Sequence, residues 1–364
     1  MKRAALFTHV PLDVLGGTGR LTEQLLRLLT DEGFDVEIYE PRASNTRLGK
    51  LLQPLAQCYA LGRRVGRNLG SYNLVVTIGY TAGFLRGSNV ICISCGSVQS
   101  YYDAIKRVPG QNRRLFFSAS MMTLCDRLSK RGKRCIAISP QVKEELARDY
   151  GVQSTVVPCG IDTKHFSWRA TGKDLRARHG IDPDVTVGLY AGRWDTAHKG
   201  LDALISLMRE RSDVHWLMAP NSDVRIPGIK RLTVLQDVRF EDLPNLYSAA
   251  DFSIQLSRYE SFGFCLLESL SCSVPALSTP VGIAPQVYND PLLRNLLVPH
   301  PEQGARHSLE EIFGKIDLLK DSSYRTELGR RGRARVEKEF SLDMWRDRMR
   351  EVIKLALEDR ACGL

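Results

Sequence analysis

Short apolar segments alternate with longer amphipathic segments along almost the whole chain. The apolar segments are typical of buried strands and lie near residues 4–9, 35–39, 74–78, 90–94, 134–138, 154–157, 185–191, 214–218, 232–235, 252–256, 275–278 and 295–298. Helical spacing of apolar residues marks the segments near 19–30, 200–209, 242–249, 263–272 and 305–320. Such alternation is typical of parallel sheets with crossover helices, so the pattern predicts an α/β protein.

The pattern divides into two similar halves. A turn-rich segment, 158–167, separates them, and the polar stretch that follows contains two Gly and one Pro before residue 185. Because 364 residues exceed what one hydrophobic core usually supports, we expect two Rossmann-like domains, 1–167 and 168–340. A last helical segment, 341–364, has an apolar side but no strand after it, so it must pack elsewhere.

Positive charge is concentrated in one part of the first half. The segment from Arg42 to Arg134 holds 16 Lys and Arg but only Asp103 and Asp126, a net charge of +14, whereas the whole chain has +10. Such a surface attracts an anionic membrane, an anionic acceptor or nucleic acid, and a solvated face that only aids solubility is the alternative. The sequence contains no zinc-finger or RNA-binding motif, so we expect no nucleic-acid partner.

Cysteine usage and hydropathy point to the cytoplasm. Nine cysteines, an odd number, are scattered through the chain, which is typical of a reducing compartment. No apolar run approaches the roughly 20 residues that cross a bilayer, and the N-terminal segment reads as a buried strand, not as a signal peptide. Cys92 and Cys95 form a lone C-x-x-C pair that we interpret as structural thiols. No metal site is predicted.

Two loops at predicted strand ends carry phosphate-binding chemistry. Gly16-Gly17-Thr18-Gly19 lies between the first strand and the first helix, where it allows a ligand to approach the main chain or forms a turn with positive φ. Gly192-Arg193 ends a strand of the second half, and Lys199-Gly200 precedes the next helix. Arg193 and Lys199 would therefore lie at the carboxyl edge of a parallel sheet, where a diphosphate can bind.

Two glutamates flank the most informative stretch. Glu260 follows a strand-like run, and Glu268 lies within the next helix, with seven residues between them. A carboxylate in the loop can accept hydrogen bonds from sugar hydroxyls, and one in the helix can accept both ribose hydroxyls. The N–H groups at the helix start, around Phe262-Gly263-Phe264, can meet phosphate or sugar oxygens. Favourable interaction with the helix dipole is the alternative reason for Glu260.

These residues resemble the E-x7-E motif of the retaining GT-B glycosyltransferases of family GT4. The similarity extends to the segments 156–166, 192–200 and 242–251 and so spans most of the chain. It implies two Rossmann-like domains whose parallel sheets face a central cleft, with the last helix crossing back to the N-terminal domain. Family members are usually metal-independent, which implies that the D-x-D string at 182–184 is a loop before a strand.

The resemblance also implies roles for individual residues. The donor diphosphate would be held by Arg193 and Lys199, the ribose by Glu268, and the donor sugar by Glu260 together with the backbone of 262–264. A further approach to the phosphate would come from Gly17 in the opposite domain. The sequence departs from the family where Cys95-Gly96-Ser97-Val98 replaces a common histidine, and where Gln286 replaces a common glutamate.

We therefore expect a cytoplasmic retaining glycosyltransferase that needs no cofactor. The donor would be a UDP-, GDP- or ADP-sugar with a hexose-type sugar, and the acceptor a membrane-associated glycolipid or a polysaccharide precursor. The basic segment from Arg42 to Arg134 would bring the enzyme to the inner face of the membrane. Alternatives are a GT-B sugar-nucleotide epimerase or phosphorylase, and a non-catalytic basic protein that binds membrane or nucleic acid.

Overall fold

The chain folds into two compact α/β units. The computed structural model describes residues 2–10, 16–40, 69–85, 87, 89–106, 114–299 and 306–361. Unit 1 comprises residues 1–159 with 345–364, and unit 2 comprises residues 160–344. The sequence interpretation placed the corresponding divisions after residues 167 and 340. Of the predicted basic segment, Arg42 to Arg134, residues 42–68, 86, 88 and 107–113 lie outside the described residues.

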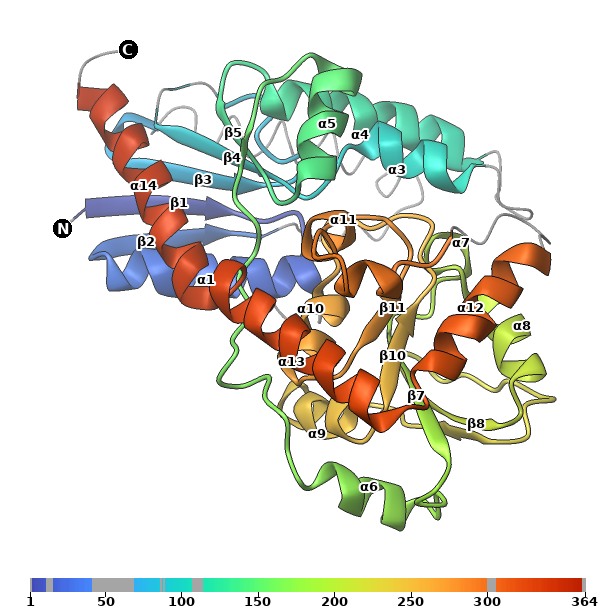
Figure 1. Ribbon diagram of the computed structural model, residues 1–364. Coiled ribbons are helices and arrows are strands. Elements are labelled where there is room, and N and C mark those ends of the chain that lie inside the picture. Colours follow the sequence, from blue (N-terminus) through green and yellow to red (C-terminus); the bar gives the residue numbers. More distant parts are fainter. Residues whose placement is uncertain are drawn as a thin grey trace. The chain divides into compact units, whose positions relative to one another are not determined.

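Unit 1 contains a parallel sheet with the strand order β2-β1-β3-β4-β5-β6. Its strands are Lys2–Phe7 (β1), Phe34–Tyr39 (β2), Leu74–Ile78 (β3), Val90–Ser94 (β4), Arg134–Ala137 (β5) and Thr155–Val156 (β6). Its helices are Gly17–Asp31 (α1), Val98–Ile105 (α3), Arg114–Lys130 (α4) and Pro140–Tyr150 (α5), with a 3₁₀ turn at Leu69–Ser71. All residues of β3 and β4 are buried, as expected for central parallel strands. In the view of Figure 1, α1 lies below these strands and α5 above them.

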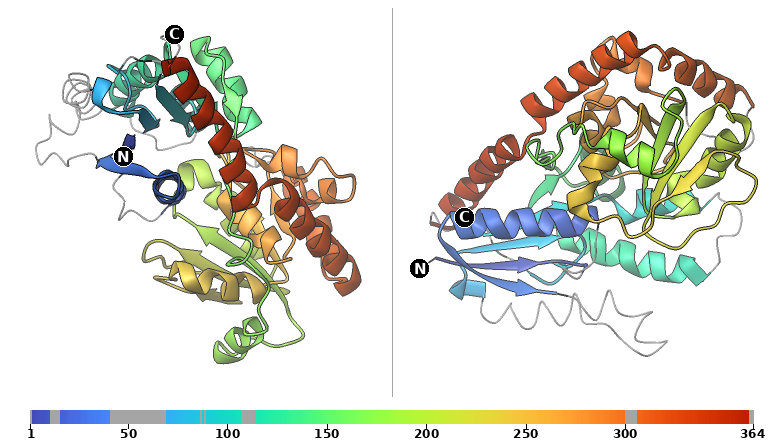
Figure 2. Two further views of the ribbon diagram at one scale, coloured as in Figure 1. Left: turned by 90° about the vertical axis from the view of Figure 1, so that its left-hand side faces the viewer. Right: turned by 90° about the horizontal axis from the view of Figure 1, so that it is seen from below.

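The C-terminal helix, Leu342–Ala361 (α14), packs mainly on unit 1. Its apolar side buries Trp345, Met349 and Ala356 almost completely. Arg350 pairs with Glu32 at the end of α1, with 2.7 Å between Nε and Oε1. Figures 1 and 2 show this helix in dark red, running to the C-terminus. The last helix, which has no strand after it, therefore packs on unit 1. This packing buries the apolar side that the sequence predicted for it.

Unit 2 contains a parallel sheet with the strand order β11-β10-β7-β8-β9. Its strands are Thr186–Gly192 (β7), Val214–Pro220 (β8), Leu232–Val234 (β9), Phe252–Gln255 (β10) and Ala276–Ser278 (β11). Its helices are Gly172–Arg178 (α6), Thr196–Lys199 (α7), Leu201–Glu210 (α8), Leu243–Ser248 (α9), Phe264–Ser271 (α10), Ala284–Val287 (α11), Arg306–Leu318 (α12) and Ser322–Glu339 (α13), with 3₁₀ turns at Phe240–Asp242 and Leu293–Leu296. The core between sheet and helices is formed by residues such as Trp216, Phe252 and Leu267.

The predicted strand near 295–298 is wrong. Residues Leu293–Leu296 form a 3₁₀ turn, and only Leu297 makes an isolated bridge, to Ser278. Leu293 and Leu296 are each 1% exposed. A short apolar run indicates burial, but it does not distinguish a buried strand from a buried turn.

Helix α13 lies in a polar stretch for which no element was predicted. Its buried positions include Gly329 and Gly332. A Cβ atom at Gly329 would lie 2.0 Å from the backbone oxygen of Ser273, so the helix approaches its neighbour through bare backbone. A contact surface made of glycine leaves no apolar periodicity in the sequence, which explains why the pattern did not show this helix.

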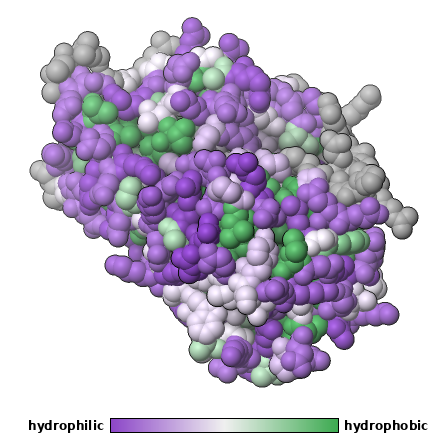
Figure 3. Space-filling view, viewed as in Figure 1, coloured by the Kyte–Doolittle hydropathy of each residue, from purple (hydrophilic) through white to green (hydrophobic). Residues whose placement is uncertain are grey.

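The face of the molecule that Figure 3 shows is predominantly polar. Its hydrophobic side chains lie in small, separate groups. Within the described part of the chain, no helix combines the length and hydropathy that crossing a bilayer requires.

Candidate functional site

The sheet of unit 2 reverses its strand order between β7 and β10. From β7 the chain continues outward to β8 and β9, then returns to place β10 and β11 on the other side of β7. The loops that leave β7 and β10 therefore diverge at the carboxyl edge of the sheet. In open α/β sheets this switch point is where ligands bind. The loops contain the predicted residues Arg193, Lys199 and Glu260.

The loop after β7 is fixed by its backbone and presents an exposed guanidinium. The Tyr190 hydroxyl donates to the Arg193 carbonyl oxygen at 2.7 Å, and the Trp194 N–H donates to Oδ1 of Asn221 at 3.0 Å. The backbone of this loop is held by hydrogen bonds, while the guanidinium of Arg193 is exposed to solvent. A cation placed in this way is suited to binding an anion.

Lys199 is positioned by close packing of its neighbours against the end of β10. Gly200 follows it with φ at +63°, and a Cβ atom there would lie 2.0 Å from the backbone oxygen of Leu256. In addition, the Arg258 N–H donates to the carbonyl oxygen of His198 at 2.7 Å. The two loops of the switch point are thus joined, and the glycine after Lys199 is required by space as well as by backbone angle.

Lys199 and Glu260 form a direct ion pair in this loop junction. The ammonium group of Lys199 donates to Oε1 of Glu260, and the Ser257 hydroxyl donates to the same oxygen at 2.8 Å. Each charged side chain is only 15% exposed. The pair therefore lies where water screens charges weakly, which strengthens the attraction between the two groups.

The pair stabilises the charged forms of both residues. Burial alone would lower the pKa of Lys199, but the carboxylate of Glu260 outweighs burial and raises this pKa above its ordinary value. Burial alone would raise the pKa of Glu260, but the charge of Lys199 and its hydrogen bond lower it below its ordinary value. Arg193 is near enough for its charge to oppose the rise in the pKa of Lys199. Two cations and one anion thus coexist at neutral pH.

Helix α10 begins shortly after Glu260, at the same carboxyl edge of the sheet. Gly263 precedes the helix with φ at +106°, and no side chain caps its first turn. The rings of Phe262 and Phe264 pack edge-on with 4.9 Å between their centroids. The Ile283 N–H donates to the Phe262 carbonyl oxygen at 2.7 Å, and this holds the loop. The N–H groups of an uncapped helix start can bind phosphate or sugar oxygens.

Glu268 lies deeper in α10 than the other predicted residues. It is 1% exposed, and the hydroxyl of Tyr247 donates to its Oε2 at 2.8 Å. The carboxylate is therefore oriented by a hydroxyl from α9 and lies within the helix layer. Its predicted contact with ribose stays a prediction.

Gly17 belongs to unit 1 and is the first residue of α1. Its predicted contact with the donor phosphate stays a prediction. Neither Gly16 nor Gly17 has φ in the left-handed region, and a Cβ atom at Gly16 would meet no atom within 4 Å. The alternative that these glycines serve a turn with positive φ is therefore wrong for these two positions.

The loop 95–98, which departs from the family pattern, donates hydrogen bonds to carboxylates of unit 1. The Ser97 N–H donates to Glu145 at 3.0 Å, its hydroxyl donates to Asp149 at 2.6 Å, and the Val98 N–H donates to Asp126 at 3.1 Å. The start of α3 is thus already satisfied by internal anions, which leaves it unsuited to bind an external one.

The cysteine pair, the D-x-D string and Gln286 each have contacts within the fold of their own unit. Cys92 is buried and in register with Cys135 of the next strand, and Cys95 is partly buried with a free thiol. The 182–184 string forms a turn before β7, as predicted, in which Oδ1 of Asp182 accepts the Asp184 N–H at 3.0 Å. Gln286 lies in α11, where its carbonyl oxygen accepts from Arg335 at 3.0 Å.

Sequence reasoning missed three contributors to the site. Ser257 orients Glu260, Tyr247 orients Glu268, and Gly282 packs so tightly that a Cβ atom would lie 2.3 Å from the Phe262 oxygen. Ser257 directly follows the predicted strand 252–256 and Gly282 lies four residues after the predicted strand 275–278, and these positions near strand ends were the available signal. Tyr247 had none, since it reaches its partner from another helix.

Comparison with known proteins matches both units. The sequence model "Glycosyl transferases group 1" matches residues 172–335, and "Glycosyltransferase Family 4" matches residues 15–165. The D-inositol 3-phosphate glycosyltransferase of Streptomyces bingchenggensis (strain BCW-1) is 28% identical over 212 residues, which cover 51% of this chain and 46% of that protein. The chain thus spans about half the length of the curated relatives that it matches.

Solved structures share the fold over nearly the whole chain. Sucrose-phosphate synthase from Thermosynechococcus elongatus has a TM-score of 0.77 at 20% identity, covering 97% of this chain and 98% of that one. HepE of Anabaena, solved in complex with UDP-glucose, has a TM-score of 0.71 at 15% identity, covering 96% and 99%. Both likenesses concern the two-unit architecture.

Proposed function

This chain belongs to the GT4 family of glycosyltransferases and has the GT-B fold, and from this premise we propose that it is a retaining enzyme that uses a nucleotide-diphosphate sugar. It transfers a hexose-type sugar to a membrane-associated glycolipid or a polysaccharide precursor. The observation that carries the proposal is the ion pair of Lys199 and Glu260 beside Arg193 at the switch point of unit 2. The HepE structure with UDP-glucose supports the class of donor.

In the proposed mechanism, cations hold the leaving group. Arg193 and Lys199 bind the donor diphosphate, whose negative charge grows as the bond to the anomeric carbon breaks. Charge stabilisation of this group is the main catalytic effect, because it is strongest in the transition state. No protein nucleophile is required.

The ion pair is compatible with donor binding because an ammonium group has three donors. Lys199 gives one hydrogen bond to Glu260, which leaves two for phosphate oxygens. Glu260 keeps one carboxylate oxygen beyond the one shared with Ser257 and Lys199, and that oxygen accepts from a sugar hydroxyl. The pair thus connects the diphosphate side of the donor to its sugar side.

The proposed acceptor follows from the basic segment of the first half. Its charge favours an acceptor that is anionic or embedded in an anionic membrane. The relative from Streptomyces is named for an inositol phosphate, which is a small anionic compound.

Donor binding can be measured by thermal denaturation with a panel of UDP-, GDP- and ADP-hexoses. One of them should stabilise the protein by about 2.7 kcal/mol when present at about 100 times its Kd. Arg193→Ala should weaken this effect, since the exposed guanidinium is removed without loss of a packed group. Arg330→Ala is the matched control, because that arginine is exposed and pairs only with its helical neighbour Glu327 among the described contacts. Equal stabilisation of the Arg193 variant would contradict the proposed site.

A further inference from the structure

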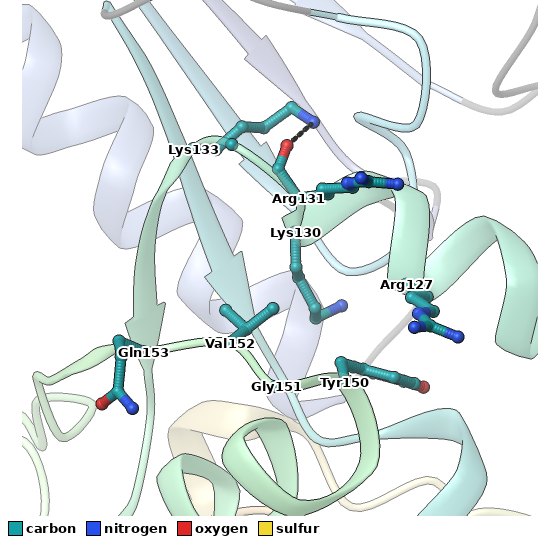
Figure 4. Close-up of a pocket in the computed structure, with 9 residues that line it drawn as sticks. Arg127, Lys130, Arg131, Lys133, Tyr150, Gly151, Val152 and Gln153 are labelled. Carbon is teal, nitrogen blue, oxygen red and sulfur yellow. Dashed lines mark hydrogen bonds between the residues drawn. The ribbon is translucent and has the colours of Figure 1, made fainter.

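Unit 1 contains a cavity of about 440 Å³ that the proposed transfer reaction does not use. Figure 4 shows its lining, to which Arg127 and Lys130 of α4, Arg131 and Lys133 of the following turn, and Tyr150 of α5 contribute. The remaining lining comes from the turn of residues 151–153 and Gly132. Cavities of about 300 to 1,000 Å³ are typical of small-molecule sites.

The cavity lies at the edge of the sheet opposite to the one that carries the glycine-rich turn. Residues 131–133 lead directly into β5, and residues 151–153 lead into β6. The cavity is therefore at the amino ends of these strands, whereas Gly17 follows the carboxyl end of β1. Since nucleotides bind at the carboxyl edge of such sheets, this cavity is separate from that position.

Its lining is basic and contains no acidic residue. The amino group of Lys130 is fully buried and pairs with Asp126, whose other oxygen accepts from the Tyr150 hydroxyl at 2.8 Å. This charge is therefore balanced internally. Arg127 and Arg131 are exposed, and among the described residues no ion pair joins either of them to an acidic side chain.

The ends of two helices account for only part of this charge. Helices α4 and α5 both end at the cavity, and each helix C-terminus carries about half a negative charge. Lys133 meets one of them directly, since its Nζ donates to the carbonyl oxygens of Leu128 at 3.2 Å and Arg131 at 3.4 Å. Lys133 offsets the partial charge at the end of α4, and the half charge at the end of α5 is too small to balance both Arg127 and Arg131, so positive charge remains in surplus.

We propose that this cavity binds a phosphate group through Arg127 and Arg131. Arg127 lies in the last turn of α4 and Arg131 directly follows the helix, and both line the same cavity. Guanidinium groups offer paired N–H donors that match phosphate oxygens, and the cavity has room for the group that carries the phosphate. This group is either a soluble phosphorylated compound or a phospholipid headgroup, and the exposed Leu124 one turn earlier on α4 would face the lipid in the second case.

Two binding measurements on the full chain test the site and identify the source of the phosphate. Inorganic phosphate is titrated calorimetrically, and sedimentation is measured with phosphatidylcholine vesicles that contain or lack phosphatidylglycerol. Each is carried out on the wild type, on the double variant Arg127→Ala/Arg131→Ala, and on Arg330→Ala/Arg331→Ala. The last is matched in charge and exposure but lies on α13.

The double variant should weaken binding at least about tenfold, since two charge-assisted contacts are lost, and the control should change it less than about twofold. Loss in the phosphate titration assigns a soluble ligand, and loss confined to anionic vesicles assigns a headgroup. The binding that Arg127→Ala/Arg131→Ala removes should persist in Lys199→Ala, which separates this site from the proposed donor site. Absence of binding in both measurements, or equal weakening by the control, would overturn the proposal.

Discussion

Lys199 and Glu260 owe their importance to being paired and only slightly exposed. Each would destabilise the loop junction if left alone, because an unpaired charge in a site with little water is costly. Together they are held ready for a donor, and the neighbouring Arg193 adds the second positive charge that a diphosphate needs. The sequence showed the types and spacing of these residues, but it did not show that the first two contact each other.

Removing either charge should abolish transfer while the fold persists. Lys199→Ala should lower kcat/KM by about 100-fold to 1,000-fold, the cost of losing one group that stabilises developing charge. Glu260→Ala should also lower kcat/KM, because Lys199 loses its partner and the donor sugar loses an acceptor. Circular dichroism should retain the α/β spectrum, since Lys199 ends the four-residue helix α7 and Glu260 lies in a loop. Near-normal turnover by either variant would count against their assigned roles.

The pH dependence of stability should reveal the pair. Its contribution is fully present between pH 4.5 and 10.5, the ordinary pKa values of the two groups. It is lost as pH falls through the lowered pKa of Glu260 and as pH rises through the raised pKa of Lys199. Urea unfolding of the wild type and of Lys199→Met/Glu260→Gln should therefore differ in pH slope only outside this range. A variant with the same slope at acid pH would show that the pair is not formed.

At the level of elements, the strand pattern was the more reliable predictor. Continuous apolar runs such as those of β3 and β4 arise because parallel strands are buried on both sides, so they stand out in a sequence. Helices α3, α4 and α5 were not predicted, although α5 has a serine cap, a proline in its first turn and a left-handed Gly151 at its end. Local capping signals of this kind, and not apolar periodicity, mark α5 in the sequence.

The junction between α7 and α8 gives a test at this scale. Gly200→Ala should destabilise the protein by more than about 2 kcal/mol, because the backbone is left-handed and the new methyl group would strike Leu256. Gly180→Ala is the matched control, since Gly180 has nearly the same φ, +61°, and no atom within 4 Å of the added carbon. It should cost about 1 kcal/mol. Equal costs in chemical denaturation would mean that the two loops are not packed as described.

At the level of the whole molecule, the C-terminal helix is the element that the local pattern could not place. Its apolar side predicted burial, but the periodicity of a helix does not indicate which part of the chain the helix packs against. The structure assigns residues 345–364 to unit 1, where the helix returns after the chain has completed unit 2. The two-unit division itself was readable from the restart of the strand pattern, because each sheet needs its own set of apolar runs.

The docking of α14 should depend on apolar burial more than on charge. Trp345→Ala should lower the free energy of unfolding by about 3 to 5 kcal/mol, because a side chain that is 1% exposed leaves a large cavity. Arg350→Ala should cost less than about 1 kcal/mol, since its ion pairs are 44% exposed on the arginine side. Similar costs for the two substitutions would show that the helix is held by its ion pairs.

The most direct test of sugar transfer at this site is the release of nucleoside diphosphate from UDP-, GDP- and ADP-hexoses, with and without glycolipid and polysaccharide-precursor acceptors. The account predicts release from one donor that depends on an acceptor, a product with the anomeric configuration of the donor, and loss of both in Lys199→Ala. Release or epimerisation that needs no acceptor, or turnover that survives this substitution, would contradict it.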